Sequence, residues 1–496
     1  DSAGNVRPAH KGNYGSTVIL VEYNYNDLGV VNKFKGMIRV KVAPYMGVAS
    51  PMVAAGGGYT IALKYDGTVW AWGYNKNGEL GQGNTTSVYS PVQVKSSDGS
   101  SYLTDIIEIA AGSYHNLALA KDGTVWSWGY NANGQLGNGT GTNSLLPIKV
   151  KIGGGSVDLT GVASIAAGYY SSFAVRKDGT VWAWGYNYAG QLGLGDGTNR
   201  TTAQQVLGGA SGSQYLTDIV EVKAATWHTL ALKANGTVYA WGCNKYGQLG
   251  STGSNSSRPV QVVTGQQGSA SGYLEKVVEL DAASEADSTW GTSITVTESK
   301  EVYGWGYSGD GYGGYGPLGK NGTFTSPIKV SNINTAVGVA LGGTDHAQFT
   351  YILKEDGTVS SLGYNDYGQL GNGTADNKSQ PIQVGGGSSN AMRITHGTVI
   401  NTTTGIQSKE YENELITNVT IAEDEQLHIL TDGISLNQSF SLLVGNTQLS
   451  QGDVEYTSFN TNIATVGETD GIVTPVKGTY GTAVIIAKSN GYSSII

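Results

Sequence analysis

Short apolar runs separated by polar turns recur along most of the chain. In one copy, residues 172–176 and 180–184 form two such runs, and Lys177-Asp178-Gly179 lies between them. An Asp-Gly pair in this position favours a β-hairpin with a type I′ turn, because that turn requires positive φ angles. No segment shows a sustained helical period of 3.6 residues. The pattern therefore predicts an all-β protein made of short, repeated strands.

A Trp-Gly pair marks each copy of the repeat. The pair or its counterpart begins at Trp72, Trp128, Trp184, Trp241, Trp305 and Leu362, which gives steps of 56, 56, 57, 64 and 57 residues. Self-similarity at a period of this size is typical of solenoids and propellers. We therefore predict six four-stranded blades between residues 50 and 390.

Side-chain size predicts where the parts of each unit pack. Ala-Ala-Gly stretches such as residues 110–112 are small, as expected where blades crowd around a central axis. The bulky Val-Trp-Ala-Trp stretch at 181–184 provides surface for packing one blade on the next. One leucine in each glycine-rich loop is expected to fill the space between blades: Leu80, Leu136, Leu192, Leu249 and Leu370.

One longer pattern joins these parts. It reads A-A-G-x-x-H-x-L-A-L, then D-G-T-V-W-x-W-G-x-N-x-x-G-Q-L-G, and residues 110–137 match it almost throughout. This pattern resembles the regulator-of-chromosome-condensation repeat, the unit of a β-propeller family, over about residues 50–390. The resemblance implies a ring that usually has seven blades and is often closed by strands from both chain ends. Six copies are clear here, so the seventh is either assembled from other segments or missing, and we expect seven in total.

Two segments flank the repeats. Residues 1–49 are predicted to form an extended segment and a β-hairpin, with strands at 16–25 and 34–42. This hairpin either closes the propeller or pairs with a neighbouring subunit. Residues 391–411 are predicted to be a linker or a degenerate blade, whose start is at 393–397.

The composition changes at about residue 412. Residues 454–466 include S-F-N-T-N-I-A-T-V, and residues 471–478 read G-I-V-T-P-V-K-G. The segment 412–496 resembles the bacterial Ig-like domain (group 2), with Tyr456 in place of the usual Trp and Ile463 in place of the first Val. The resemblance implies a C-terminal β-sandwich of a kind that typically occurs on bacterial surface proteins.

Composition narrows the class of protein. Glycine supplies 75 of 496 residues, which suits a turn-rich β-protein, and only 14% of residues are charged, which is typical of a secreted or cell-surface protein. The net charge of −9 disfavours nucleic acid as a partner, because phosphate binding needs a basic surface. No apolar run reaches 18 residues, so no membrane insertion is expected. The single cysteine, Cys243, takes the place of a repeat tyrosine, and we interpret it as structural.

The ionisable residues do not form a recognisable catalytic or metal site. His115, His228 and His346 were assigned to one repeat position, where a structural hydrogen bond is favoured over an axial metal site. Most aspartates lie in turns, and the loops at 195–197 and 309–311 lack the alternating acidic ligands of a calcium site. No nucleophile triad or phosphate-binding loop is present, so we predict a protein that is not an enzyme and has no metal or cofactor.

Aromatic residues are the best candidates for binding. The fifth repeat carries an insertion with Tyr312 and Tyr315, preceded by Trp290, and this insertion is the best candidate because the repeat itself does not need it. The tyrosines of the Gly-Tyr-Asn loops are further candidates. For all these rings, packing against their own blades is favoured over an exposed binding role. Two functions remain open for a bacterial extracellular or cell-surface protein. The propeller is an interaction module for other proteins or surface glycans, or the chain is a structural subunit that binds copies of itself in a filament or surface layer.

Overall fold

The computed structural model describes residues 52–385 except 65, 210–213, 285–288, 310–315, 331–332 and 344–347, and the backbone of strands near both chain ends. The chain divides into two compact units. One unit spans residues 51–393, and the other combines residues 1–50 with 394–496. In the described residues, no helix combines the length and apolar character needed to cross a membrane.

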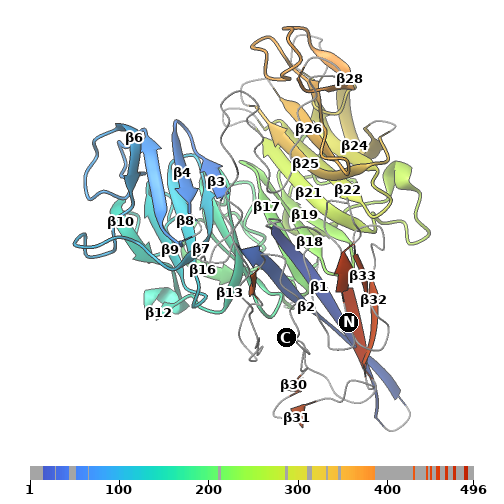
Figure 1. The fold of residues 1–496 in the computed structure, drawn as a ribbon, viewed down its shortest axis with the longest axis horizontal. Coiled ribbons are helices and arrows are strands. Elements are labelled where there is room, and N and C mark those ends of the chain that lie inside the picture. The colour runs from blue at the N-terminus through green and yellow to red at the C-terminus, as the bar shows by residue number, and fades with distance from the viewer. Residues whose placement is uncertain are drawn as a thin grey trace, which may run out of the picture. The chain divides into compact units, whose positions relative to one another are not determined.

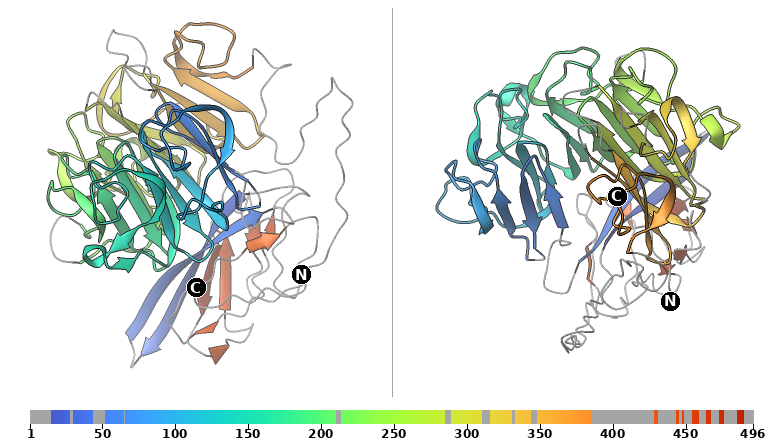
Figure 2. Two further views of the ribbon diagram at one scale, coloured as in Figure 1. Left: turned by 90° about the vertical axis from the view of Figure 1, so that its left-hand side faces the viewer. Right: turned by 90° about the horizontal axis from the view of Figure 1, so that it is seen from above.

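Within its described residues, the larger unit contains six antiparallel four-stranded sheets, in each of which the strands lie side by side in chain order. Figures 1 and 2 show these blades following one another around a common axis, from blue to orange. Blades one to three are β3 (Met52–Ala55), β4 (Tyr59–Leu63), β5 (Val69–Gly73) and β6 (Val88–Gln93); β7 (Ile106–Ala111), β8 (His115–Ala120), β9 (Val125–Gly129) and β10 (Ser144–Lys149); β13 (Val162–Ala167), β14 (Ser171–Arg176), β15 (Val181–Gly185) and β16 (Arg200–Gln205). Blades four to six are β17 (Ile219–Ala224), β18 (His228–Lys233), β19 (Val238–Gly242) and β20 (Ser256–Gln261); β21 (Val277–Ser284), β22 (Gly291–Thr297), β23 (Val302–Ser308) and β24 (Gly322–Lys329); β25 (Ala336–Gly342), β26 (Phe349–Lys354), β27 (Val359–Gly363) and β28 (Lys378–Gln383). The predicted all-β propeller architecture is confirmed.

The connections between blades hold the remaining short elements of this unit. They are the strand pair β11 (Lys151–Ile152) and β12 (Val157–Asp158), and the 3-10 helices η1 (Gly153–Gly155) and η2 (Gly265–Gln267).

The hairpin between the second and third strands differs from the predicted type I′ turn. In blade three only Gly179 has a positive φ, of 75°, whereas Asp178 does not. The Asp178 carboxylate instead accepts hydrogen bonds from the Thr180 backbone N–H (3.0 Å) and from the Thr180 hydroxyl (2.6 Å). Aspartate therefore stabilises this turn through its side chain, and glycine alone provides the left-handed residue.

Leucine and tryptophan join neighbouring blades, as side-chain size predicted. Leu192 of blade three and Trp241 of blade four are fully buried in one hydrophobic cluster. The indole Nε1 of each buried tryptophan also donates to a loop carbonyl of the preceding blade. The pairs are Trp128 with Glu79 (2.8 Å), Trp184 with Gln135 (2.9 Å), Trp241 with Gln191 (2.8 Å) and Trp305 with Gln248 (2.9 Å). These contacts therefore pack each of these blades against its neighbour and give each buried indole N–H a hydrogen-bond acceptor.

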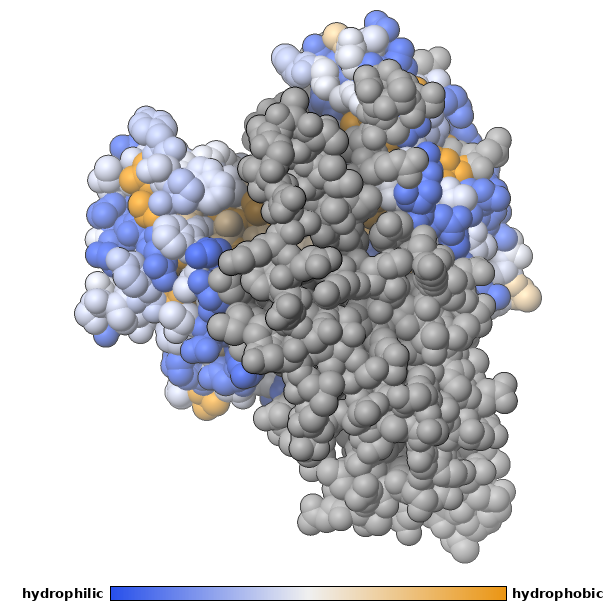
Figure 3. Space-filling view, viewed as in Figure 1, coloured by the Kyte–Doolittle hydropathy of each residue, from blue (hydrophilic) through white to orange (hydrophobic). Residues whose placement is uncertain are grey.

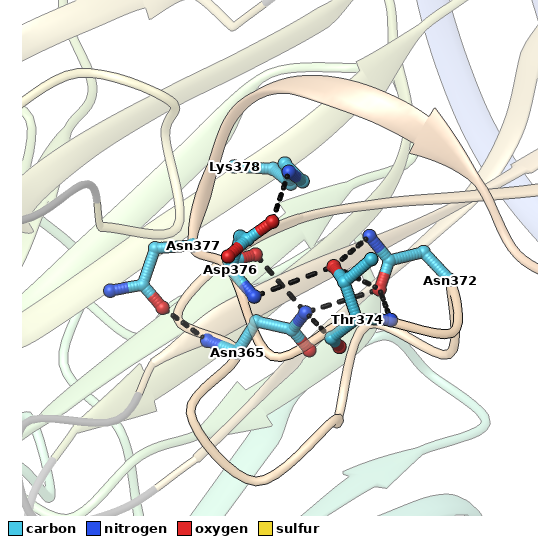
Figure 4. A network of polar contacts seen from close by, with 6 residues as sticks. All are labelled: Asn365, Asn372, Thr374, Asp376, Asn377 and Lys378. Carbon is cyan, nitrogen blue, oxygen red and sulfur yellow. Dashed lines mark hydrogen bonds and ion pairs between the residues drawn. The ribbon is translucent and has the colours of Figure 1, made fainter.

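An asparagine holds the glycine-rich loop of most blades. In blade six, the Asn365 amide donates to the Thr374 carbonyl (2.8 Å) and the Asp376 carbonyl (3.1 Å), and its oxygen accepts from Leu370 N–H (2.7 Å). Figure 4 shows this residue at the centre of the loop network. Asn75, Asn131, Asn187 and Asn244 make matching bonds in blades one to four. Hydrogen bonds within each loop therefore fix its conformation.

Two histidines also connect blades. His115 and His228 are fully buried, and their Nε2 atoms lie 2.9 Å from Ser172 Oγ and 3.0 Å from Ser293 Oγ in the next blade. The structural interpretation of these two residues is supported, but the assignment of His346 to the same position is wrong. Phe349 occupies that position, because it pairs with Gly363 as His115 pairs with Gly129. Blade six has a longer loop there, and His346 lies outside the described residues.

These histidines predict a pH dependence of stability. Burial lowers the pKa of both imidazoles to about 3, below their ordinary value of about 6.5. Their contribution to stability is therefore complete above pH 6.5 and declines as the pH falls toward 3, by about 1.4 kcal/mol per histidine and pH unit at most. We expect the double variant His115→Gln/His228→Gln to have a smaller loss of unfolding free energy than wild type between pH 7 and 5, measured by urea denaturation. An equal loss in both proteins would contradict this explanation.

The first blade has an exposed flank. Its Val53 is 70% exposed, whereas the equivalent Ile109, Ile165, Val222 and Leu280 of the next four blades are at most 7% exposed. Trp72 of this blade is likewise only half-buried, in contrast to the fully buried tryptophans of blades two to five. In blades two to five these positions contact the preceding blade, whereas in blade one the corresponding surface is exposed.

The smaller unit is described only by its strands. β1 (Gly15–Asp27) and β2 (Val30–Ala43) form an antiparallel hairpin, in the segment for which strands at 16–25 and 34–42 are predicted. This hairpin shares a sheet with β29 (His428–Leu430), β35 (Ile485–Ser489) and β32 (Val454–Ser458), in the order β29-β2-β1-β35-β32. The remaining elements are β30 (Leu443–Val444), β31 (Thr447–Gln448), β33 (Ala464–Val466) and β34 (Val473–Pro475). The Ig-like sandwich at 412–496 and the role of 391–411 stay predictions.

Candidate interaction surface

Aromatic side chains gather at one end of the blades. The loop between the first and second strands and the loop between the third and fourth strands both leave that end of an antiparallel sheet. In blades one to four these two loops carry a connected group of rings, which we name the aromatic arc: Tyr74, Tyr114, Tyr130, Tyr169, Tyr170, Tyr186, Tyr188 and Trp227.

The Trp-Gly pair explains why rings from the two loops meet. Gly129 has a φ of 105°, and a Cβ atom there would lie 2.5 Å from the Tyr114 carbonyl oxygen. Only glycine permits this approach. The next N–H, that of Tyr130, then donates to the Tyr114 carbonyl at 2.8 Å. The Tyr186 N–H makes the same bond to the Tyr170 carbonyl at 2.9 Å, so the geometry repeats in the next blade.

The rings of the arc contact one another mainly edge to face. The centroid distances are 6.4 Å for Tyr74 and Tyr114, 6.4 Å for Tyr170 and Tyr186, and 5.9 Å for Tyr186 and Trp227, with interplanar angles of 64°, 74° and 70°. Tyr169 and Tyr170 form the closest pair, at 4.5 Å and 85°. Such pairs stabilise the arrangement beyond simple burial. The arc is therefore a continuous track across four blades.

The rings of the arc are partly exposed to solvent. Tyr188 is 78% exposed and Tyr74 is 38% exposed, whereas the other rings of the arc are half-buried. Burial raises the pKa of Tyr169, and hydrogen bonds with Tyr114 and Tyr170 raise it further. The Tyr169 hydroxyl therefore stays protonated at neutral pH.

Charged groups are sparse around the arc. In the loops that form this end of blades one to four, the charged residues are Lys76, Glu79, Asp196 and Lys245. Glu79 is fully buried, and Asp196 pairs with Arg200 at 2.6 Å. Figure 3 shows pale and hydrophilic colours over most of the described surface in that view, with small hydrophobic spots. The surface of the arc therefore consists mainly of aromatic rings and hydroxyl groups, with few charged side chains.

A second aromatic group lies in blades four and five. Trp290 stacks on Tyr307 at a centroid distance of 4.3 Å, and Tyr246 contacts both rings, at 6.2 and 5.5 Å. Trp290, a residue predicted from the sequence, is therefore half-buried among loop aromatics. Tyr312 and Tyr315, the other two predicted residues, lie outside the described part of the chain. Their role as ligand-binding residues stays a prediction.

Aromatic residues at the other end of the blades are differently placed. Lys64 lies 5.4 Å above the ring of Trp70, and the Arg176 guanidinium lies 5.8 Å above the ring of Trp182. A cation over each ring makes these contacts internal to the blade. Because a cation lies over each of these rings, they differ from the rings of the aromatic arc, which contact one another.

Three ionisable groups of the described residues have structural roles or surroundings that disfavour catalysis. No group of three or more His, Cys, Asp or Glu side chains there could hold a metal ion. Glu108 accepts from Ser164 Oγ at 2.9 Å, and Asp281 accepts from the Leu341 N–H at 2.7 Å, so both carboxylates join neighbouring blades. Cys243 is buried, and burial raises the pKa of its thiol, which disfavours a nucleophilic thiolate.

Sequence reasoning identified part of the arc. It named the tyrosines of the Gly-Tyr-Asn loops as candidates, with packing against the blade favoured, and the structure has Tyr74 38% exposed and Tyr130 and Tyr186 half-buried. It missed the other five residues: Tyr114, Tyr169, Tyr170, Tyr188 and Trp227. The signal for Tyr114, Tyr170 and Trp227 is that the residue directly before the second strand is aromatic in consecutive blades.

Sequence comparison gives two family matches. The profile of the RCC1-like domain matches residues 36–347, and that of the regulator of chromosome condensation (RCC1) repeat matches residues 356–398. The ultraviolet-B receptor UVR8 of Arabidopsis thaliana is 31% identical over 337 residues, which cover 66% of this chain and 68% of the receptor. The human E3 ubiquitin-protein ligase HERC2 is 28% identical over 334 residues, but the match spans only 6% of that protein.

Solved structures share the fold. Human WBSCR16 is similar with a TM-score of 0.53 and 19% identity, covering 75% of this chain and 94% of that protein. Yeast RCC1 (Prp20), crystallised with Kap60, gives a TM-score of 0.51 and 17% identity, covering 77% of this chain and 87% of that one.

Proposed function

Because this chain belongs to the family of RCC1-like domains, we propose that its propeller is a non-catalytic protein-interaction module that binds through the aromatic arc. The observation that carries this proposal is the unbroken, accessible track of rings across blades one to four. Rigid aromatic side chains are enriched at the energetically important centres of protein interfaces.

Relatives of this fold bind proteins. Yeast RCC1 (Prp20) was crystallised bound to Kap60, and a second study of that protein concerns its binding to Gsp1p and histones. These partners belong to the yeast protein. For the present chain they support the class of function, namely recognition of another protein, and the arc provides the surface.

The loops are organised for binding without rearrangement. The glycine-rich loops are tied by asparagine bonds such as Asn131 to Leu136 (2.9 Å), and the rings support one another in pairs. Side chains that are already ordered lose less conformational entropy when a partner binds. Because few charges lie nearby, affinity should change little between low and high salt.

Site-directed photo-cross-linking tests this function. A photoreactive phenylalanine analogue is placed at Tyr188 on the arc, or at Tyr89, which is 99% exposed but outside the arc. We expect a protein adduct in an extract of the source organism from position 188 alone, and its loss when Tyr114→Ala and Tyr170→Ala are added. Equal labelling from both positions, or no adduct from position 188, would refute the assignment.

We also propose a secreted or cell-surface location in a bacterium. The support is the low charged fraction of 14% and the resemblance of residues 412–496 to a bacterial Ig-like domain. A structural role in a filament or surface layer is the alternative, and surface glycans are the second ligand class of the first proposal. Fractionation of cells followed by electron microscopy of native material separates these cases: regular fibres or sheets containing this chain would favour the structural role.

A seventh blade completes the ring in our proposal. The exposed flank at Val53 and Trp72 supports it, as do the family matches, which begin at residue 36 and continue to residue 398. Val53→Asp should then lower the melting temperature by about 5 °C or more, as expected for a charge placed in a packed interface. Val222→Asp serves as the matched control at a position that is only 5% exposed. An unchanged melting temperature for the Val53 variant would show that no blade covers this flank.

A further inference from the structure

The aromatic arc connects its tryptophan to an exposed tyrosine through an unbroken series of ring contacts. We infer that the arc transfers one-electron oxidation from Trp227 to the surface tyrosine Tyr188. This activity is separate from partner binding, so either one can hold without the other.

The ring contacts provide the route. Trp227 lies 5.9 Å from Tyr186 between centroids, and Tyr186 lies 6.4 Å from Tyr188, with an interplanar angle of 19°. A second branch runs from Tyr186 to Tyr170 (6.4 Å) and on to Tyr114 (6.2 Å). Rings at these distances are in contact, and an electron tunnels readily between rings in contact. Because tryptophan and tyrosine lose an electron more easily than other aromatic side chains, each step joins two groups that can be oxidised.

Other tryptophans of the propeller have different surroundings. The Arg176 guanidinium lies 5.8 Å above the ring of Trp182, and its positive charge opposes the removal of an electron from that ring. Trp241, which is fully buried, contacts Phe173 at 6.4 Å, and phenylalanine is much harder to oxidise than tyrosine. Trp227, in contrast, contacts a tyrosine that leads to the surface. The arc is therefore suited to move an oxidising equivalent outward.

The protons determine where the transfer ends. A radical one-electron oxidant removes an electron from Trp227, and the indole proton leaves to solvent. The indolyl radical then takes one electron from Tyr188 by way of Tyr186 and one proton from water, while the Tyr188 phenol proton passes to water. Tryptophan is restored, and a neutral tyrosyl radical remains. Tyr188 is 78% exposed, whereas burial raises the pKa of Tyr186, so the proton leaves more readily from Tyr188.

Pulse radiolysis of the full chain tests the inference. Azide radicals oxidise tryptophan, and the decay of the tryptophyl absorbance is followed together with the rise of the tyrosyl absorbance. Every protein carries Trp290→Phe, because Trp290 stacks on Tyr307 at 4.3 Å and would add a separate signal. We expect a transfer phase whose rate does not depend on protein concentration. Trp227→Phe and Tyr186→Phe should each remove the same component of this phase, and Tyr89→Phe should leave it unchanged.

Spin trapping followed by mass spectrometry locates the end point. We expect a trap adduct at Tyr188 that is lost in Tyr186→Phe and retained in Tyr89→Phe. Phenylalanine keeps the ring, and circular dichroism melts confirm that each variant is folded.

Any of three results would overturn the inference: no concentration-independent phase, a phase that Tyr186→Phe leaves unchanged, or a Tyr188 adduct that Tyr186→Phe leaves unchanged. A photo-cross-linked partner adduct from position 188 alongside any of these results would leave the interaction function standing. Only the transfer of oxidation would then be wrong.

Discussion

Trp184→Ala is expected to lower the free energy of unfolding of the propeller by about 3 to 5 kcal/mol, the usual range for a buried Trp or Phe changed to Ala. Trp184 is completely buried between blades two and three, and its Nε1 donates to the Gln135 carbonyl at 2.9 Å. The substitution leaves a cavity between the blades and removes a donor from a buried carbonyl. Urea denaturation followed by far-ultraviolet circular dichroism measures the loss.

Trp70→Ala is the matched control for this prediction. Trp70 lies in the same repeat motif but is only half-buried, where its Nε1 donates to Thr68 Oγ1 at 3.1 Å and Lys64 covers its ring. We expect a loss of about 1 kcal/mol, since a partly exposed side chain gives up less packing. Equal losses for the two variants would mean that the contact between blades is not what stabilises the ring.

Tyr114→Ala/Tyr170→Ala is expected to weaken partner binding by roughly 1,000-fold, because clustered aromatic anchors each contribute about 2 kcal/mol. These residues lie at the centre of the arc, where Tyr114 contacts Tyr74, Tyr130, Tyr169 and Tyr170. Titration of the partner identified by cross-linking against wild type and variant gives the ratio of dissociation constants.

The control for the arc variant is Tyr89→Ala/Tyr102→Ala. These tyrosines are 99% and 54% exposed, but they lie outside the arc. The control should bind as wild type does, and both double variants should melt within a few degrees of it. Loss of binding in the control, or retention of affinity in the arc variant, would place the interface elsewhere.

The repeated architecture was predictable because the same short motif is repeated along the chain. Each strand pair, the buried leucines and the contact between blades through tryptophan follow from side-chain size and period. Two details were not predictable in this way. The turn at Asp178-Gly179 depends on a side-chain hydrogen bond that replaces the second positive φ. The register of blade six depends on the pairing of Phe349 with Gly363, whereas a similar local pattern drew attention to His346.

The candidate surface was only partly predictable, for a physical reason. Tyr114 and Tyr130 are 16 residues apart in sequence, and they meet because Gly129 lets the backbone pass close to the Tyr114 carbonyl. Tyr114 and Tyr170 meet across a blade boundary, one full repeat apart. Such neighbours follow from the three-dimensional ring rather than from local sequence. Tyr312 and Tyr315 were predicted as binding residues because their insertion interrupts the repeat. The residues of the arc belong to the repeat, so the sequence pattern does not single them out.

Hydroxyl-radical footprinting of the full chain, with and without its cross-linked partner, tests the central claim most directly. Oxidation of each tyrosine is read by mass spectrometry. The proposed function predicts that Tyr74 and Tyr188 of the arc become protected in the complex, whereas Tyr89 and Tyr102 are oxidised at unchanged rates. Protection of Tyr89 and Tyr102, with Tyr74 and Tyr188 still oxidised as in the free chain, would contradict it.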